Sequence, residues 1–169
     1  MKRVWVSLAV AALFLAALPL AAQTGAWTAV GSTGVVDESA AAIYAFGSTN
    51  LTYLGSSTST NAIVARYNVT NTWGMSDTPP WTVLEMGYTD NNPSVSVRAD
   101  LFKVDPCTGA QSLICTVTSL DSTTSTCARC PVFAANTFNF GTNAYYVQVT
   151  LTRTAITVTP PSLLSLRIR

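Results

Sequence analysis

The sequence predicts an all-β protein, an antiparallel two-sheet β-sandwich of about nine strands. Three segments alternate apolar and polar residues with a period of two, and clusters of turn-forming residues separate the β-rich runs at short intervals. No helical period occurs after the N-terminal stretch of the 169-residue chain. Half-buried strands without helices to cover them need a second sheet to bury their apolar faces.

The N-terminus has the pattern of a secretory signal peptide. A positive start, residues 1–3, precedes an almost uninterrupted apolar stretch, residues 4–20, and the small residues Ala21 and Ala22. We expect cleavage after Ala22, which makes residues 1–22 the signal peptide. A single-pass anchor is the alternative, since roughly 20 apolar residues span a bilayer. The mature chain is expected to be secreted, periplasmic or held at the cell surface.

The composition suits one exported domain. Cleavage would leave 169 − 22 = 147 residues, which is enough for a single domain with a real core. Loss of Lys2 and Arg3 would leave 9 − 2 = 7 basic against 8 acidic residues, a net charge of −1. Such a chain has nothing to attract nucleic acid or an acidic membrane. The expected partner is an extracellular glycan or a protein at the cell surface, with no membrane span in the mature chain.

The first mature segment is the least regular one. Residues 23–39 are rich in Gly, Ser, Thr and Ala, and they predict a loose arm or an edge strand. Residues 40–169 are expected to form the single sandwich domain.

The strongest strands lie at 63–70, 94–104 and 145–153. In the first of them the odd-numbered residues from Ile63 to Val69 share one face, and Arg66 and Asn68 lie on the other. This is the pattern of half-buried antiparallel strands. Weaker strands are predicted at 41–46, 51–54, 81–88, 113–120, 138–140 and 163–168. Turn residues at 90–93 and at 105–109 predict two hairpin connections. A jelly-roll or immunoglobulin-like sandwich follows from this series.

Four cysteines fall within 24 residues: Cys107, Cys115, Cys127 and Cys130. An even, clustered number in an exported chain predicts two disulfides, for which three connectivities are possible. If strand 113–120 turned back near Asp121, Cys115 would lie opposite Cys127, and Cys107 would be left for Cys130. A four-thiolate zinc site and a redox dithiol at Cys127 and Cys130 are the alternatives.

The chain contains no histidine, which excludes Ser-His and Cys-His nucleophile systems. A carboxylate pair remains as the catalytic possibility, and most carboxylates lie in turns. The acidic residues are Asp37, Glu38, Asp77, Glu85, Asp90, Asp100, Asp105 and Asp121. Glu85 differs because it lies mid-strand, where it could be a general acid. A carboxylate paired with arginine or facing solvent is the alternative interpretation of Glu85.

No cofactor is expected, with calcium as the one weak possibility. Asp90, Asn91 and Asn92 place three oxygen-bearing side chains in one turn, and oxygen atoms are the ligands that calcium prefers. Their spacing matches no known calcium loop. Turn formation is the alternative, because turns prefer the same residues.

Two tryptophans give the remaining functional hypothesis. Trp73 and Trp81 bracket a Pro-containing loop that could present aromatic rings to solvent. Exposed rings beside the carboxylates of Asp77 and Glu85 could stack on sugar faces and bind the sugar hydroxyls. The alternative is that both tryptophans plug the open ends of the sandwich.

The leading interpretation is therefore an exported, non-enzymatic β-sandwich that binds a glycan. The alternatives are a structural or adhesive cell-surface subunit, whose sheet edges pair with other chains, and a hydrolase that uses Glu85 with a second carboxylate. The overall pattern is similar in general form to jelly-roll carbohydrate-binding modules. No family-specific motif accompanies this likeness, so it assigns no functional residue.

Overall fold

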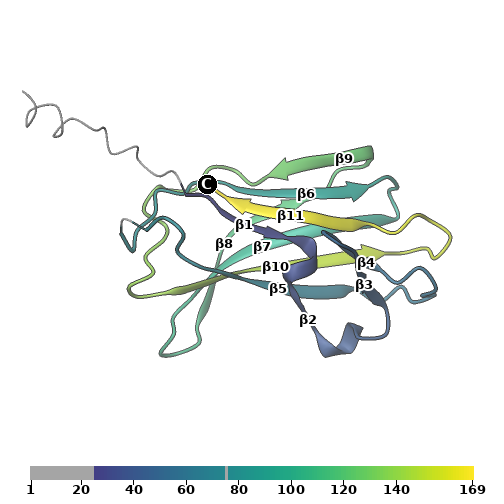
Figure 1. The fold of residues 1–169 in the computed structure, drawn as a ribbon, viewed down its shortest axis with the longest axis horizontal. Coiled ribbons are helices and arrows are strands. Elements are labelled where there is room, and N and C mark those ends of the chain that lie inside the picture. Colours follow the sequence, from purple (N-terminus) through teal and green to yellow (C-terminus); the bar gives the residue numbers. More distant parts are fainter. Residues whose placement is uncertain (1–24, 75) are drawn as a thin grey trace, which may run out of the picture.

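The structure is a computed structural model that describes residues 25–74 and 76–169. Two antiparallel sheets pack face to face, as the alternating strands predict (Figure 1). The expected signal peptide lies outside the described residues. Within the described ranges, no helix has the length and apolar character needed to cross a membrane.

Sheet A has six strands in the order β3-β4-β11-β6-β9, with β1 also paired to β11. Its strands are β1 (Trp27–Val30), β3 (Tyr44–Phe46), β4 (Leu51–Tyr53), β6 (Leu84–Asp90), β9 (Ser122–Arg129) and β11 (Ser162–Ile168). Sheet B has five strands in the order β2-β5-β10-β7-β8. They are β2 (Val35–Val36), β5 (Ile63–Val69), β7 (Val95–Val104), β8 (Gln111–Thr118) and β10 (Ala144–Arg153).

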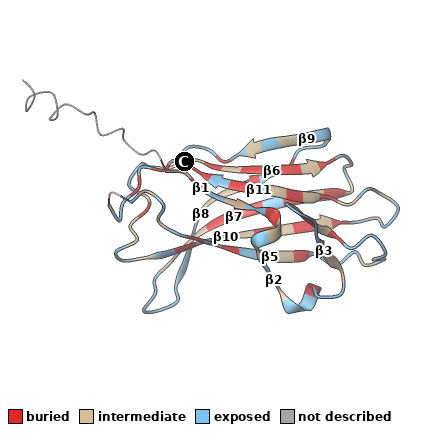
Figure 2. Cartoon of the chain, viewed as in Figure 1, coloured by how far each residue is buried: buried red, intermediate tan, exposed pale blue. Residues whose placement is uncertain are grey.

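The inward faces of the two sheets form one core, whose buried residues are red in Figure 2. In β5 the odd-numbered residues from Ile63 to Val69 are buried, and Arg66 and Asn68 are exposed. The same alternation runs along β10 from Tyr145 to Leu151. The predicted period of two is confirmed, because each strand faces the opposite sheet on one side only.

Within the N-terminal segment, for which the composition predicts either a loose arm or an edge strand, residues 27–30 and 35–36 form edge strands. β1 pairs with β11 of sheet A and β2 pairs with β5 of sheet B, with the 3₁₀ turn η1 (Gly31–Thr33) between them. A Cβ atom at Gly31 would overlap the Leu163 carbonyl oxygen, so only glycine fits at this crossing. The Tyr67 hydroxyl donates a hydrogen bond of 2.6 Å to the Gly31 carbonyl. The sandwich thus begins at β1, before residue 40.

One predicted hairpin is confirmed and the other is wrong. Strands β7 and β8 pair around the 105–109 turn, where the Asp105 carboxylate accepts backbone hydrogen bonds and Gly109 has a φ of 72°. The 90–93 turn instead carries the chain from β6 in sheet A to β7 in sheet B. Turn residues mark a change of direction equally well in both cases, and only sheet packing distinguishes them.

Two further differences concern individual strands. Residues 138–140 form no strand, and Phe138 is instead a fully buried loop residue whose ring packs edge-on against Trp81. Strand β9 is absent from the sequence prediction because Ser122–Arg129 consists mainly of Ser and Thr without apolar alternation. It lies at an edge of sheet A and stays largely exposed, so it needs little apolar surface.

The expected cysteine pairing is wrong. Strand β8 pairs with β7 in sheet B, whereas β9 pairs with β6 in sheet A, so Cys115 does not lie opposite Cys127. Cys115 instead packs against the buried core cluster that includes Cys130, and each thiol shifts the pKa of the other, upward at Cys115 and downward at Cys130. All four cysteines are free thiols in this structure, with Cys107 and Cys127 exposed.

Candidate ligand-binding site

A row of polar side chains crosses four strands on the outward face of sheet A. The backbone register aligns Thr28 of β1 with Arg167 of β11, Arg167 with Glu85 of β6, and Glu85 with Arg129 of β9. All four residues therefore share one face, opposite the core. We call Thr28, Arg167, Glu85 and Arg129 the arginine row.

Glu85 is the centre of the charges in this row. Its Oε2 atom lies 2.6 Å from Nε of Arg129 and 3.4 Å from an Nη atom of Arg169. Partial burial acts to raise the pKa of Glu85, but the hydrogen bonds and positive charges of Arg129 and Arg169 outweigh it and lower that pKa. Glu85 is therefore a carboxylate held between two guanidinium groups.

The positive side chains outnumber the carboxylate. Arg129, Arg167 and Arg169 carry three charges against the single charge of Glu85, so this group of side chains has a net charge of 3 − 1 = +2. Among the described residues, Arg167 makes no ion pair within 4.0 Å. A pocket of about 480 Å³ lies at this place, and its lining includes all three arginines together with Thr82 and Val132.

A second, smaller pocket adjoins the first one. It has a volume of about 200 Å³ and is lined by Trp73, Pro80, Trp81, Gly25, Ala26 and Arg169. Ala26 and Arg169 belong to both linings, so the two pockets are neighbours on one surface. We call this smaller pocket the tryptophan pocket. It places the loop that carries Trp73 and Trp81 next to the arginine row.

The two tryptophans differ in what they can offer a ligand. Trp81 is only 2% exposed, its Nε1 donates to the Gly25 carbonyl at 2.8 Å, and its ring packs edge-on against Phe138 and Phe140. Trp81 is therefore a core residue and does not present a free ring to solvent. This agrees with the alternative interpretation, in which the tryptophans of this loop fill the end of the sandwich. Trp73 is half-buried and packs against the same core. Only Trp73 keeps ring surface accessible.

Asp77 and Glu85 do not act as a pair. Asp77 is exposed in the 73–81 loop, where its backbone carbonyl accepts a 2.7 Å hydrogen bond from Phe140, and it lines none of the pockets around the arginine row. Glu85 is the one predicted polar residue that the structure places on this surface.

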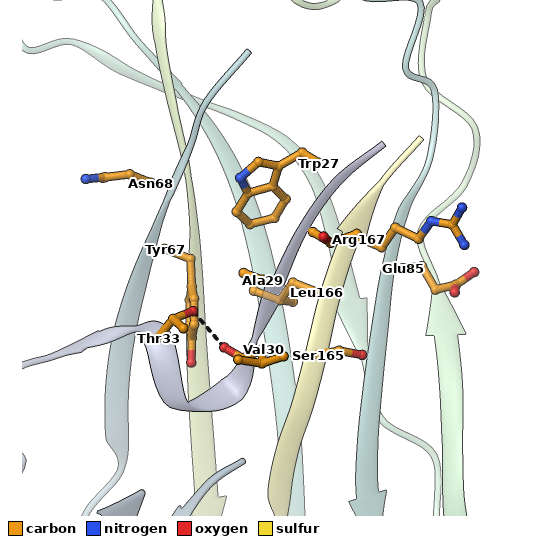
Figure 3. A pocket seen from close by; sticks show the side chains of 11 residues that line it. Trp27, Ala29, Val30, Thr33, Tyr67, Asn68, Glu85, Ser165, Leu166 and Arg167 are labelled. Carbon is orange, nitrogen blue, oxygen red and sulfur yellow. Dashed lines mark hydrogen bonds between the residues drawn. The ribbon is translucent and has the colours of Figure 1, made fainter. Parts of the chain in front are cut away.

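A larger pocket, about 680 Å³, lies at the edge of sheet A that β1 forms. Figure 3 shows Trp27, Ala29 and Tyr67 on the inner side of β1 and β11, and Arg167 and Glu85 on the outer side. The pocket shares Arg167 with the 480 Å³ pocket, so it extends the same surface beyond the arginine row. Its polar groups include hydroxyls and the amide of Asn68.

The residues considered for calcium have other partners. One carboxylate oxygen of Asp90 accepts a hydrogen bond from the Ser119 hydroxyl, and the side-chain oxygen of Asn92 accepts one from the Ser94 amide at 2.8 Å. Asn91 lines a separate pocket beside β9. Over residues 25–74 and 76–169, no group of three or more His, Cys, Asp or Glu side chains could hold a metal ion.

Sequence reasoning missed the three arginines. Arg167 and Arg169 alternate with Ile168 at the end of the last strand, so they share a face, and this period-two signal is readable in the sequence. Arg129 carried no such signal, because β9 itself was not predicted and its register with Glu85 depends on sheet pairing.

Solved structures include several with a general likeness to this chain. An isomalto-dextranase of Arthrobacter globiformis T6 complexed with panose has a TM-score of 0.47 and 11% identity, covering 86% of this chain and 23% of its own. The C-terminal family 22 carbohydrate-binding module of Clostridium thermocellum Xyn10B has a TM-score of 0.43 and 13% identity, covering 83% of both chains. Infectious bursal disease virus, Gt strain, has a TM-score of 0.39 and 9% identity, covering 85% of this chain and 31% of that chain.

The chain spans from 23% to 33% of the length of the first three solved structures that it matches. No family model and no curated protein matches the sequence. With TM-scores below 0.5, none of the structural likenesses bears on what this chain binds.

Proposed function

We propose that this chain is an exported, non-catalytic module that binds acidic glycans on the outward face of sheet A. The observation that carries the proposal is the meeting of the arginine row and the tryptophan pocket on one continuous surface. Guanidinium groups bind carboxylates and sulfates through paired hydrogen bonds, and an aromatic ring packs on the apolar face of a sugar.

The charges support an acidic ligand. The side chains of the arginine row and of Arg169 together carry a net charge of +2, although the whole chain is close to neutral. Arg167 is exposed and lines both larger pockets, so its donors are available to a ligand. Pocket volumes of about 480 and 680 Å³ fall within the range of about 300–1,000 Å³ that is usual for ligand sites.

The test is a glycan-array screen of the purified protein with neutral, uronate-containing and sulfated sugars. Acidic glycans should bind, and the binding should weaken with rising salt, because exposed charges are screened over about 10 Å at 0.1 M ionic strength. Arg167→Gln should lower the affinity about tenfold by removing one charged hydrogen-bonding group.

The matched control is Arg66→Gln. Arg66 is an exposed arginine on β5 of sheet B, and the same change there removes the same charge without touching sheet A. If Arg167→Gln and Arg66→Gln weakened binding equally, the loss would come from the change in net charge alone. That result would contradict a site on the arginine row. Absence of binding to every acidic glycan would refute the proposal itself.

The geometry disfavours a hydrolase. A general acid must hold a proton near neutral pH, whereas Arg129 and Arg169 lower the pKa of Glu85. In the described lining of the pockets that include Arg167 or Arg169, Glu85 is the one carboxylate, and Asp121 lines a separate pocket that reaches Arg129. The described lining of the pocket that contains Glu85 holds no second carboxylate to complete the pair of a glycoside hydrolase.

The structural-subunit alternative is favoured by one observation, the exposed edge of β9. Among the residues that the structure describes, this eight-residue strand pairs only with β6, so its other edge leaves backbone groups to pair with a second chain. Concentration-dependent assembly in sedimentation experiments, abolished by Thr124→Pro in β9, would support this alternative. A monomer at all concentrations would contradict it.

A further inference from the structure

Two cysteines from different sheets meet at one open edge of the sandwich. Cys115 lies on β8, the edge strand of sheet B, and its register partner Leu101 is fully buried, so Cys115 faces the core. Cys130 directly follows β9, the edge strand of sheet A, and is 5% exposed. Cys115 packs against the buried core cluster that includes Cys130, so the two thiols approach each other between the sheets.

Backbone contacts hold Cys130 in place. Its amide donates to the Leu84 carbonyl at 3.1 Å, and the Leu84 amide donates to the Cys130 sulfur at 3.4 Å. The interaction with the Cys115 thiol and the hydrogen bond from Leu84 lower the pKa of Cys130, against the opposing effect of burial. The interaction with the Cys130 thiol and burial raise the pKa of Cys115. The pair thus contains one thiol suited to be the thiolate and one suited to remain protonated.

We propose that Cys115 and Cys130 form a disulfide that joins the two sheets, and that Cys107 and Cys127 take no part in it. The two thiols lose two protons and two electrons and form one S–S bond. A small disulfide oxidant, such as oxidised glutathione, accepts them and becomes two thiols. The other two cysteines are exposed, one in the β7–β8 turn and one on β9.

The bond has a consequence for the arginine row. Arg129 immediately precedes Cys130, so a link at Cys130 fixes the end of β9 that delivers Arg129 to Glu85. β9 otherwise depends on its single neighbour β6 within sheet A. The cross-link therefore positions one of the arginines of the proposed ligand site, although the thiol chemistry itself does not depend on any ligand.

The test starts with the unaltered full chain equilibrated in a glutathione redox buffer. Alkylation of the free thiols followed by peptide mapping should find one disulfide, between the peptides that contain Cys115 and Cys130, with Cys107 and Cys127 alkylated. Four alkylated cysteines, or a disulfide that joins either Cys115 or Cys130 to Cys107 or Cys127, would overturn the proposal. A failure of glycan binding would leave this result unchanged, so the two proposals fail separately.

Thermal unfolding gives a second readout. The bridge would close a loop of 130 − 115 = 15 residues. Reduction should then lower Tm by on the order of 10 °C. The double variant Cys107→Ser with Cys127→Ser should keep this sensitivity to reduction, whereas Cys115→Ser should abolish it. Sensitivity that persists in Cys115→Ser would contradict a bond at this position.

Discussion

Arg129 of β9 and Glu85 of β6 form an ion pair across neighbouring strands, with 2.6 Å between Nε and Oε2. Glu85 also contacts Arg169, which follows β11, so one carboxylate ties together side chains from three consecutive strands of sheet A. The side chain of Glu85 is 16% exposed, whereas those of Arg129 and Arg169 are 57% and 42% exposed. The carboxylate is thus shielded while the guanidinium groups remain open to a ligand.

Glu85 is expected to make stability depend on pH in the acid range. Its pKa is lower in the folded chain than the ordinary value of 4.5, so its contribution is present above that value and is lost as the pH falls through the folded pKa. The contribution should be less than about 1 kcal/mol, because the arginines are exposed. Urea unfolding from pH 6 to pH 3 should show a smaller acid loss in Glu85→Gln than in the unaltered protein. An equal loss of unfolding free energy between pH 6 and pH 3 in the two proteins would contradict the ion pair.

Trp81→Ala should destabilise the protein far more than Trp73→Ala. Removing the buried Trp81 ring leaves a cavity beside Phe138 and breaks its hydrogen bond to Gly25, at a cost of about 3–5 kcal/mol. Removing the half-buried Trp73 ring in Trp73→Ala should lower the unfolding free energy by about 1–2 kcal/mol. Denaturant unfolding of the two variants measures this difference. Comparable losses would mean that Trp73 is as much a core residue as Trp81.

Ser119→Ala should lower the unfolding free energy more than the loss of a single hydroxyl usually does. The Ser119 hydroxyl donates to the Asp90 carboxylate, which is 2% exposed, and accepts a 2.8 Å hydrogen bond from the Val97 amide. Its removal leaves a buried carboxylate and a buried amide without this partner, which should cost about 2–3 kcal/mol of unfolding free energy. Ser125→Ala on the exposed part of β9 is the matched control, with an expected change within about 0.5 kcal/mol.

Arg153→Met should loosen the loop between β4 and β5. The buried Arg153 guanidinium donates to the carbonyls of Ser57 at 2.5 Å and Ser59 at 2.8 Å, and lies 4.3 Å from the ring centre of Tyr53. Methionine fills similar space but donates nothing, so we expect a loss of about 2–3 kcal/mol.

Limited proteolysis provides the local readout for that variant. Cleavage within residues 54–62 should become faster in Arg153→Met and stay unchanged in Arg66→Met, whose arginine is exposed on the outer face of sheet B. Faster cleavage elsewhere with an intact loop would show that Arg153 supports the sandwich as a whole, contrary to the role inferred from its contacts.

The sequence by itself determined the fold class and most central strands. Apolar alternation is a property of each strand alone, because one side of a half-buried strand faces the other sheet, and the burial of β5 and β10 follows it. The absence of histidine likewise excluded the common nucleophile systems without any structure. Glu85 stood out because it lies within a strand, and the structure places it in the centre of the arginine row.

Only the tertiary structure decided which strands are neighbours. Pairing between β6 and β9 joins residues 44 positions apart, and nothing in the Ser- and Thr-rich β9 encodes its partner or register. The sheet assignments of β8 and β9 likewise placed Cys115 beside Cys130 instead of opposite Cys127. Burial of Trp81 had the same origin, since Phe138 and Phe140 reach it from a distant loop. Local patterns specify which face of a strand is buried, whereas contacts between distant segments depend on how the sheets pack.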